Sequence, residues 1–421
     1  MPDAVVAEVR LWGRLVGAVA EEENGRVTFE YSEEFAASRL AISPFTLPLS
    51  LRGPVTFPEL SRLEAFQGLP GVLADSLPDR FGNAVIARYF AARGTPELAL
   101  SPVQKLLYMG TRSLGALEFQ PAVRFRDRKA EQEPLEIARL VAEARKLIEG
   151  RPDVAIPEIM RLGASAGGAR PKAIILWNRR SNTVRSGIAA PGPEDEPWII
   201  KFDGVGELGA PDETPKPYNR IEYAYSLMAR AAGVEVPETR LVEERGLAHF
   251  MTRRFDRVED RKIHLHSLGG MRHVDYNQPG GFSYEEYLRT VQGLGPGYPA
   301  VEEAFRRTAF NLATVNQDDH VKNFAFLMDP DGAWRLAPAF DLTYARGLGY
   351  TRAHQMTLGG KTGRFVRDDL LELGRTMGIR RRGAAILDQV AAGLAGWERF
   401  AEEAGVHPNR VRFIASEFRR F

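Results

Sequence analysis

The chain has 421 residues, of which 44% are hydrophobic and 26% charged, with a formal net charge of +1 and no cysteine. This composition is typical of a folded globular protein that is long enough for two or three folding units. It excludes disulfides, thiolate metal sites and cysteine nucleophiles, and it gives no electrostatic reason to expect direct binding to nucleic acid or to an acidic membrane surface.

The first 60 residues predict a β-rich segment. Runs such as EVRLWGRLVGAVA and GRVTFEYS are apolar or alternating and are bounded by turn residues, as is usual for strands joined by turns. Charged residues interrupt the apolar start of the chain, so it lacks the form of a secretory signal, and no apolar window approaches the ~20 residues of a membrane span. We therefore expect a soluble, cytoplasmic protein without membrane contact.

Helical and strand patterns then alternate along the chain. Helical periodicity covers residues 69–94 and 134–150. The runs AIILW and WIIKFDG predict two strands, RIEYAYSLMARAAG predicts an amphipathic helix, and TRLVEERGLAHFMTRRFD predicts a hairpin. After residue 260 the pattern is mainly helical. Strands in the first part and helices in the last part predict an α+β protein with two lobes.

Residues 163–172, GASAGGARPK, form a glycine-rich loop. The first five match the G-x-S-x-G elbow of serine hydrolases, but that motif requires a preceding strand and a following helix, and here the order is reversed. Glycines permit close approach of the backbone to a phosphate, so we interpret the loop as a flap that covers phosphates. An ordinary turn is the alternative.

Lys201 stands inside the apolar run WIIKFDG, where an isolated ammonium group is costly to bury. A lysine there could neutralise the α- and β-phosphates of ATP, and Glu222, at the start of the amphipathic helix, could orient it. The alternatives are an edge-strand lysine that extends to water and the ordinary preference of helix N-termini for acids.

Residues 316–328, NQDDHVKNFAFLM, place several polar side chains directly before an apolar run. The runs FAFLM and AWRLA flank the turn sequence DPDG, so they predict a hairpin whose outer ends lie close together. Asn323 stands at one end, with Asp318 five residues before it, and the other end leads to Asp341. The hairpin therefore predicts that these three side chains converge.

Phosphoryl transfer uses this combination of side chains. In protein kinases the catalytic aspartate stands five residues before a metal-binding asparagine, and a second metal-binding aspartate follows a hairpin. The order and the spacing of Asp318, Asn323 and Asp341 are the same. Asp319 is one residue short of that spacing, so we interpret it as loop structure. An acidic loop that only supplies turns and caps is the competing interpretation.

Together these segments resemble the HipA family, the serine/threonine kinase toxins of bacterial type II toxin–antitoxin modules. The matching segments are FQGLPGVLADSLPDRFGNAVI, GTRSLGALEFQP, SAGGARPKAII and NQDDHVKNFAFL with WRLAPAFDL, which together extend over most of the chain. The resemblance implies a HipA-like N-terminal subdomain in residues 1–125. It also implies a kinase N-lobe in residues 126–255 and a mainly helical C-lobe with the catalytic loop in residues 256–421.

The resemblance further implies an ATP- and Mg²⁺-dependent serine/threonine protein kinase that inactivates itself by autophosphorylation. A phosphate on the glycine-rich loop would repel the ATP phosphates and disfavour the closed loop. The implied residues are the catalytic base Asp318, the ATP-phosphate lysine Lys201, the Mg²⁺ ligands Asn323 and Asp341, the ATP-binding residues Gly167, Gly168, Glu222 and Phe255, the autophosphorylated Ser165, and the supporting residues His320 and Lys322.

One segment departs from the family pattern. MTRRFDR resembles the adenine-binding hinge, but Arg253 stands where an acidic residue is expected. The implied partners are a helix-turn-helix HipB-like antitoxin, through which any DNA binding is indirect, and a protein substrate such as an aminoacyl-tRNA synthetase. Two other functions compete: a metal-dependent hydrolase that uses Asp318, Asp319 and His320, with or without His354, and a catalytically silent kinase fold with a regulatory role.

Overall fold

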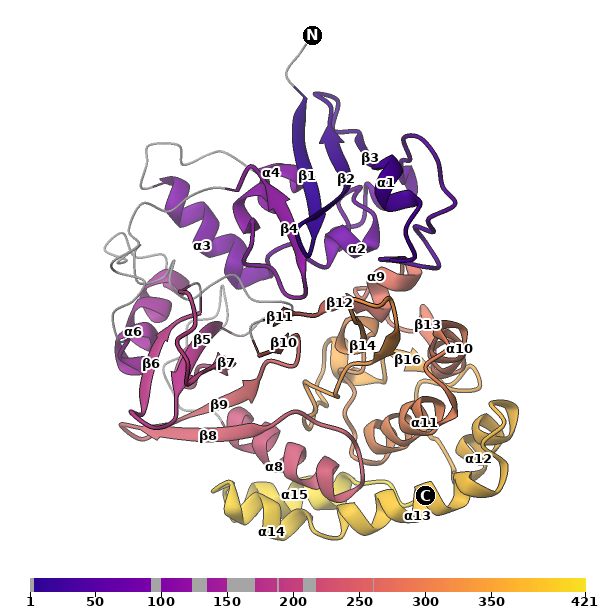
Figure 1. Ribbon diagram of the computed structural model, residues 1–421. Helices are drawn as coiled ribbons and strands as arrows, with labels where there is room; N and C mark the ends of the chain where they lie inside the picture. The colour runs from indigo at the N-terminus through magenta and orange to yellow at the C-terminus, as the bar shows by residue number, and fades with distance from the viewer. Residues whose placement is uncertain are drawn as a thin grey trace. The chain divides into compact units, whose positions relative to one another are not determined.

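The structure is a computed structural model that describes residues 4–91, 100–122, 135–149, 171–187, 189–206, 217–259 and 261–421 (Figure 1). The glycine-rich loop, with Ser165, Gly167 and Gly168, lies outside these ranges. Internal contacts divide the chain into two compact units, Met1–Lys216 with Val242–Leu265 and Pro217–Leu241 with His266–Phe421. The three domains expected from the sequence stay a prediction.

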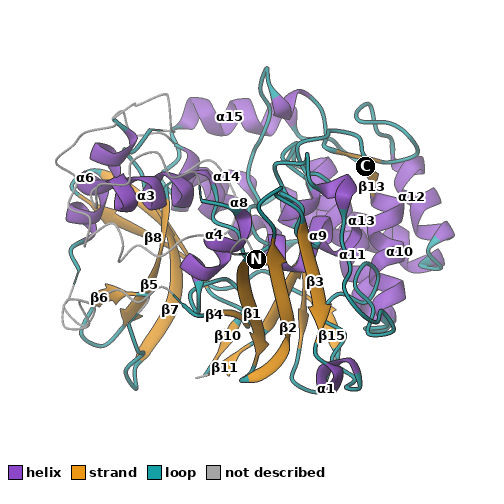
Figure 2. Ribbon diagram, turned by 90° about the horizontal axis from the view of Figure 1, so that it is seen from above, coloured by secondary structure: helices purple, strands orange, loops and turns teal. Residues whose placement is uncertain are grey.

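The first unit begins with a four-stranded antiparallel sheet in the order β3-β2-β1-β4, whose strands lie side by side in Figure 2. Its strands are β1 (Val5–Leu11), β2 (Arg14–Glu21), β3 (Val27–Tyr31) and β4 (Leu117–Gln120). Between β3 and β4 the chain forms helices α1 (Glu33–Ala36), α2 (Gly71–Ala74), α3 (Arg80–Ala91) and α4 (Pro102–Met109). The predicted β-rich start of the chain is confirmed for residues 5–31, whereas residues 32–60, including the run LAISPFTLPL that was also expected to be β-rich, form a short helix, turns and isolated bridges.

The helical pattern at residues 69–94 forms two helices rather than one. Helix α2 ends at Ala74, and α3 starts at Arg80. Pro78 disfavours a helical conformation of the residue before it, and the Asp79 carboxylate accepts a hydrogen bond from the N–H of Gly82 at 2.6 Å, which caps α3. The interruption therefore follows from a proline and a cap within the apolar pattern.

A five-stranded sheet in the order β6-β5-β7-β9-β8 forms the other half of the first unit. Its strands are β5 (Lys172–Asn178), β6 (Thr183–Ser186), β7 (Asp195–Lys201), β8 (Thr239–Glu244), which begins in the second unit, and β9 (Leu247–Arg253). Helix α6 (Ile137–Ile148) and helix α3 pack against this sheet in one hydrophobic core. That core includes Phe81, Val85, Leu140, Ala144, Ile175, Trp198, Ile200 and Met251.

The second unit is mainly helical. Its helices are α8 (Tyr218–Ala231), α9 (Leu268–Arg272), α10 (Tyr284–Leu294), α11 (Tyr298–Ala313), α12 (Arg367–Thr376), α13 (Arg380–Leu394), α14 (Trp397–Glu403) and α15 (Pro408–Glu417). Tyr225, Trp397 and Phe418 pack edge to face in its core. The predicted α+β fold with two lobes is confirmed, and none of the helices in the described part of the chain has the length and apolarity that a membrane span requires.

Short strands complete the two units. They are β10 (Arg257–Val258) with β11 (Arg261–Lys262), β12 (His264–Ser267) with β14 (Ala325–Met328) and β15 (Trp334–Leu336), and β13 (Phe282–Ser283) with β16 (Met356–Thr357). The 3₁₀ helices are Pro58–Leu60, Val321–Asn323 and Tyr350–Arg352.

Candidate active site

The predicted hairpin at residues 324–337 is present. Strands β14 and β15 pair antiparallel, with Phe326 opposite Leu336. In the turn, Gly332 has a φ of 84°, a conformation that suits glycine, and its N–H donates to the Asp329 carbonyl at 2.8 Å. Residues 316–323, here called the catalytic loop after their predicted role, lead directly into β14.

The five-residue spacing between Asp318 and Asn323 closes the catalytic loop on itself. The Asn323 Nδ2 donates to the Asp318 backbone carbonyl at 2.8 Å. Because this bond uses the amide nitrogen, the Oδ1 of Asn323 is directed elsewhere and keeps its acceptor capacity. The Asp318 side chain is 46% exposed. The loop therefore presents a carboxylate and an amide oxygen from neighbouring positions.

Asp319, unlike Asp318, is buried and held by several hydrogen bonds. Its side chain is fully buried and accepts hydrogen bonds from Tyr284 Oη at 2.5 Å, His354 Nδ1 at 2.8 Å and the Gln355 N–H at 2.7 Å. Through these three hydrogen bonds the Asp319 carboxylate anchors the loop. Within the described residues no group of three or more His, Asp or Glu side chains is arranged to hold a metal ion, which gives the hydrolase alternative no preformed ligand cluster.

His320 lies close to Asp318, the predicted catalytic base. Its Nε2 is 3.8 Å from Asp318 Oδ1, and its ring contacts that of Tyr276. Burial lowers the pKa of His320, while the nearby carboxylates of Asp318 and Asp341 oppose this shift. The influence of both carboxylates on one imidazole is consistent with the predicted convergence. Lys322 places its ammonium group 5.2 Å from the centre of the Tyr276 ring.

Asp341 has a left-handed backbone conformation, with φ of 54°. Few non-glycine residues adopt this conformation, although aspartate tolerates it better than most, and strained backbone is concentrated at functional sites. Asn323 and the residues on both sides of Asp341, Phe340 and Leu342, line one small pocket. The two predicted Mg²⁺ ligands thus belong to segments that line one pocket.

Lys201 lies in β7, which is a central strand between β5 and β9. The edge-strand interpretation of this lysine is therefore wrong. Lys201 is paired with Phe250 of β9, and its ammonium group is 5.7 Å from the centre of that ring. Glu222 is buried in the second turn of α8, beyond the first turn in which acids are generally favoured. The two residues belong to different units, and their pairing stays a prediction.

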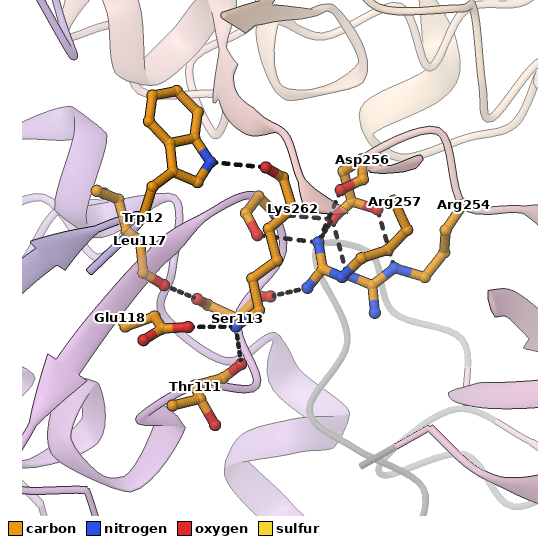
Figure 3. Close-up of polar contacts among 10 residues, drawn as sticks. Trp12, Thr111, Ser113, Leu117, Glu118, Arg254, Asp256, Arg257 and Lys262 are labelled. Atoms are coloured by element: carbon orange, nitrogen blue, oxygen red, sulfur yellow. Dashed lines mark hydrogen bonds and ion pairs between the residues drawn. The ribbon is translucent and has the colours of Figure 1, made fainter. Parts of the chain in front are cut away.

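The segment after β9, expected to be the adenine hinge, carries a buried charge network (Figure 3). Asp256 binds the guanidinium group of Arg254 through two hydrogen bonds of 2.9 and 2.7 Å, and it accepts from Arg257 Nη1 at 2.7 Å and from the Gly115 N–H at 2.8 Å. Arg257 also donates to the Gly115 and Ser113 carbonyls. The network therefore joins the residues before β4 to the segment after β9.

Electrostatics stabilise the ionised form of this network. Burial alone would raise the pKa of Asp256, but the two guanidinium groups and the Gly115 N–H hold that pKa well below its usual range. Burial lowers the pKa of Arg257 to about 10. Nearby, Lys262 Nζ binds Glu118 at 2.7 Å, and Trp12 Nε1 donates to the Lys262 carbonyl (Figure 3).

Arg253 replaces the acidic residue that was expected in the hinge segment, so its side chain cannot act as a hydrogen-bond acceptor there. Its side chain is half exposed and lies 3.8 Å from Glu196 at the start of β7. Phe255 is half-buried. Neither the Asp256 network nor the partners of Asp319 were predicted, because each set joins residues that are far apart in the sequence and share no local pattern.

Known protein families match most of the chain. A model of the HipA-like C-terminal domain matches residues 164–418, and a model of the HipA N-terminal domain matches residues 7–120. Two relatives from Sinorhizobium fredii are named "Putative kinase Y4dM" and "Putative kinase Y4mE". The first is 24% identical, with 81% of this chain and 78% of the relative covered. The second is 25% identical, with 97% and 88% covered.

Among solved structures, the chain is similar to one from the Shewanella oneidensis MR-1 toxin–antitoxin complex of HipA, HipB and operator DNA. The TM-score is 0.65 at 16% identity, and 97% of this chain and 94% of the other are covered, so the likeness shows a shared fold. The C-terminal model alone spans more than half of the 421 residues. The chain belongs to the HipA family.

Proposed function

We propose that this protein is a kinase that transfers the γ-phosphoryl group of ATP to a serine or threonine hydroxyl of a protein, with Mg²⁺ as cofactor. The observation that carries the proposal is the difference in exposure and hydrogen bonding between two adjacent aspartates. Asp318 is half exposed and bonded through its carbonyl to Asn323, whereas Asp319 is buried and fully hydrogen-bonded. A loop built in this way offers one carboxylate to a substrate and uses the other as an anchor.

In the proposed reaction the Asp318 carboxylate accepts the proton of the attacking hydroxyl. The hydroxyl oxygen forms a bond to the γ-phosphorus as the bond from that phosphorus to the bridging oxygen breaks, and ADP leaves. Lys201 binds the α- and β-phosphates, and Glu222 orients this lysine. His320, close to Asp318, and Lys322 support the loop.

Asn323 and Asp341 are suitable Mg²⁺ ligands because they supply hard oxygen atoms, and because the Nδ2 of Asn323 is already bonded within the loop. When bound, Mg²⁺ neutralises charge on the phosphates. Gly167, Gly168 and Phe255 complete the proposed ATP site, and nothing in the described residues tests the two glycines.

Ser165 is the proposed site of autophosphorylation, by which the kinase inactivates itself. The proposed partner is a helix-turn-helix antitoxin of the HipB type, since the similar Shewanella chain belongs to a HipA–HipB–DNA complex. DNA would then be reached through the antitoxin. The proposed substrate is a protein, with an aminoacyl-tRNA synthetase as the class that the family resemblance suggests.

The test uses purified protein incubated with Mg²⁺ and γ-labelled ATP. We expect label at Ser165 in the wild type and a loss of labelling in Asp318→Asn. Asp331→Asn is the matched control, because it makes the same change at an exposed turn of the same hairpin. Equal labelling of Asp318→Asn and wild type, or no transfer to Ser165 or to any protein by the wild type, would refute the proposal.

A further inference from the structure

Asp319 is one end of a buried chain of polar side chains within the second unit. His354 is fully buried, and its Nδ1 lies 2.8 Å from Asp319 Oδ2. On the other side of the ring, His354 Nε2 lies 2.8 Å from Nη1 of Arg419. Asp319 is also bound by Tyr284. The chain thus runs from Arg419 through His354 to the catalytic loop.

The chemistry of the two outer groups determines the direction of these hydrogen bonds. An arginine side chain has only donors, so Arg419 donates to Nε2. An ionised carboxylate has only acceptors, so Nδ1 carries the hydrogen that is donated to Asp319. Only the neutral His354 tautomer with hydrogen on Nδ1 satisfies both contacts. Arg419 therefore selects the tautomer that binds Asp319.

Arg419 also holds the segment that precedes the catalytic loop. Its backbone N–H donates to the Ala313 carbonyl, and its Nη1 donates to the Leu312 carbonyl, both at 2.9 Å. These two residues end α11. Two residues later, Val315 has a left-handed conformation with φ of 57°, which is a genuine outlier for a β-branched residue. A strained entry of this kind persists only where the surroundings hold it.

We propose that Arg419 and His354 are positioning residues that act on phosphoryl transfer through Asp319. This inference rests on the proposed kinase function. Asp319 fixes the loop through its buried carboxylate, and the carboxylate of Asp318, the preceding residue, is half exposed. Loss of Arg419 or His354 frees the anchor, and the base then loses its alignment with the hydroxyl. Misplacement of a reacting group by ~1 Å costs on the order of 10²-fold in rate.

A purely structural role would predict a different result. In that case the loss of Arg419 or His354 would lower the midpoint of thermal unfolding and leave the turnover of the folded protein unchanged. A positioning role lowers kcat at temperatures at which every variant is folded, and it leaves the KM for ATP nearly unchanged, because Lys201 and the hinge segment lie in the other unit.

The kinetic experiment compares Arg419→Ala, His354→Ala and His354→Asn with the wild type. We expect kcat to fall by roughly 10–100-fold in the two alanine variants, with KM for ATP within about twofold. His354→Asn keeps a donor near Nδ1 and should recover part of the loss. Arg420→Ala is the matched control, since Arg420 is adjacent and exposed, and it should stay within about twofold of the wild type. Unchanged kcat in folded Arg419→Ala and His354→Ala would overturn the inference.

A double-mutant cycle tests whether Asp319 is the point of action. If Arg419 acts through Asp319, Arg419→Ala should lower kcat by less than about twofold in an Asp319→Asn background. Full additivity of the two effects would mean that Arg419 acts elsewhere, and the inference would be wrong.

Hydrogen exchange separates this inference from the kinase proposal, because it does not depend on catalysis. Amide exchange in residues 316–323 should be faster in Arg419→Ala than in the wild type and unchanged in Arg420→Ala. If the wild type transfers no phosphate, the proposed function fails, and exchange alone then decides whether Arg419 holds the loop. Equal exchange in Arg419→Ala and wild type would overturn the inference.

Discussion

The carboxylate of Asp256 accepts a hydrogen bond from the backbone N–H of Gly115 at 2.8 Å, although 141 positions separate the two residues. The same buried carboxylate binds Arg254 and Arg257. One anion therefore joins two distant segments and is the shared counter-charge of the buried Arg254 and the partly buried Arg257. Sites of this kind are sensitive to the loss of one partner, because the remaining charges stay buried.

Asp256→Asn should strongly destabilise the first unit. The substitution keeps the shape of the side chain but removes the counter-charge of the buried Arg254 and the carboxylate partner of the partly buried Arg257, so we expect the free energy of unfolding to fall by about 3–5 kcal/mol. Urea titration followed by tryptophan fluorescence measures this loss. Glu259→Gln is the control, because this carboxylate is exposed and 3.6 Å from Arg261, and it should cost less than about 0.5 kcal/mol. Equal losses in the two variants would contradict the prediction.

His249 should make the protein less stable in mild acid. Burial lowers its pKa to about 4, and its Nδ1 accepts a hydrogen bond from the Asp203 N–H at 3.1 Å, which requires an unprotonated nitrogen. The unfolded chain has the ordinary histidine pKa of about 6.5. The unfolded state therefore binds more protons between pH 6.5 and 4, so this contribution is complete above that window and is lost as the pH falls through it. Its full size is on the order of 3 kcal/mol.

The measurement for His249 is urea unfolding at several pH values between about 4.5 and 7.5, for the wild type and for His249→Gln. Glutamine cannot take up a proton in this range, so the stability of the variant should depend less steeply on pH. Parallel curves for the two proteins would show that His249 does not cause the acid sensitivity.

Lys201 and Glu222 should be energetically coupled in ATP-dependent transfer. If the glutamate orients the lysine, Lys201→Met and Glu222→Gln should each lower kcat/KM for ATP by about tenfold or more, and the double variant should be little worse than Lys201→Met. Steady-state kinetics of the four proteins give the coupling. Glu402→Gln, at an exposed position of α14, should show no coupling with Lys201→Met. Additive losses for Lys201 and Glu222 would argue against the pair.

Asp341 should respond differently to two substitutions, because its backbone has a left-handed conformation. Asn tolerates that conformation, so the free energy of unfolding of Asp341→Asn should change little. Because the substitution removes the charged carboxylate that is the proposed Mg²⁺ ligand, the variant should lose most Mg²⁺-dependent transfer. Asp341→Ala should lose the same activity and be about 1 kcal/mol less stable than Asp341→Asn, since alanine is strained there. Phosphate transfer over a range of Mg²⁺ concentrations and urea unfolding separate the effects. Wild-type activity in Asp341→Asn would rule out its role as a ligand.

The sequence was sufficient for features that depend on local patterns. The hairpin at 324–337 was predictable because a strong turn sequence separates two short apolar runs, and β14 and β15 pair as expected. The spacing of Asp318 and Asn323 also singled out the first of two adjacent aspartates, and the burial of Asp319 agrees with a structural role for the second.

Features that depend on long-range packing were not predictable. Tyr284 is 35 positions from Asp319 and shares no local pattern with it, and Arg419 was not among the predicted residues. His354, also 35 positions away, was named only as an optional member of the alternative hydrolase site. The split at residues 75–79 was missed for another reason: its proline and its cap stand inside a continuous apolar pattern.

Helix α3 lies within the segment matched by the HipA N-terminal domain model, yet Phe81 and Val85 belong to the same core as Ile175 and Trp198, which lie within the HipA-like C-terminal domain model. The border between the two family models is therefore not a border in the folded protein. A fragment that starts after residue 120 would expose an apolar face of the five-stranded sheet to water, and we expect it to aggregate. Helix α3 and the five-stranded sheet therefore depend on each other for burial within the first unit, although they belong to segments matched by different family models.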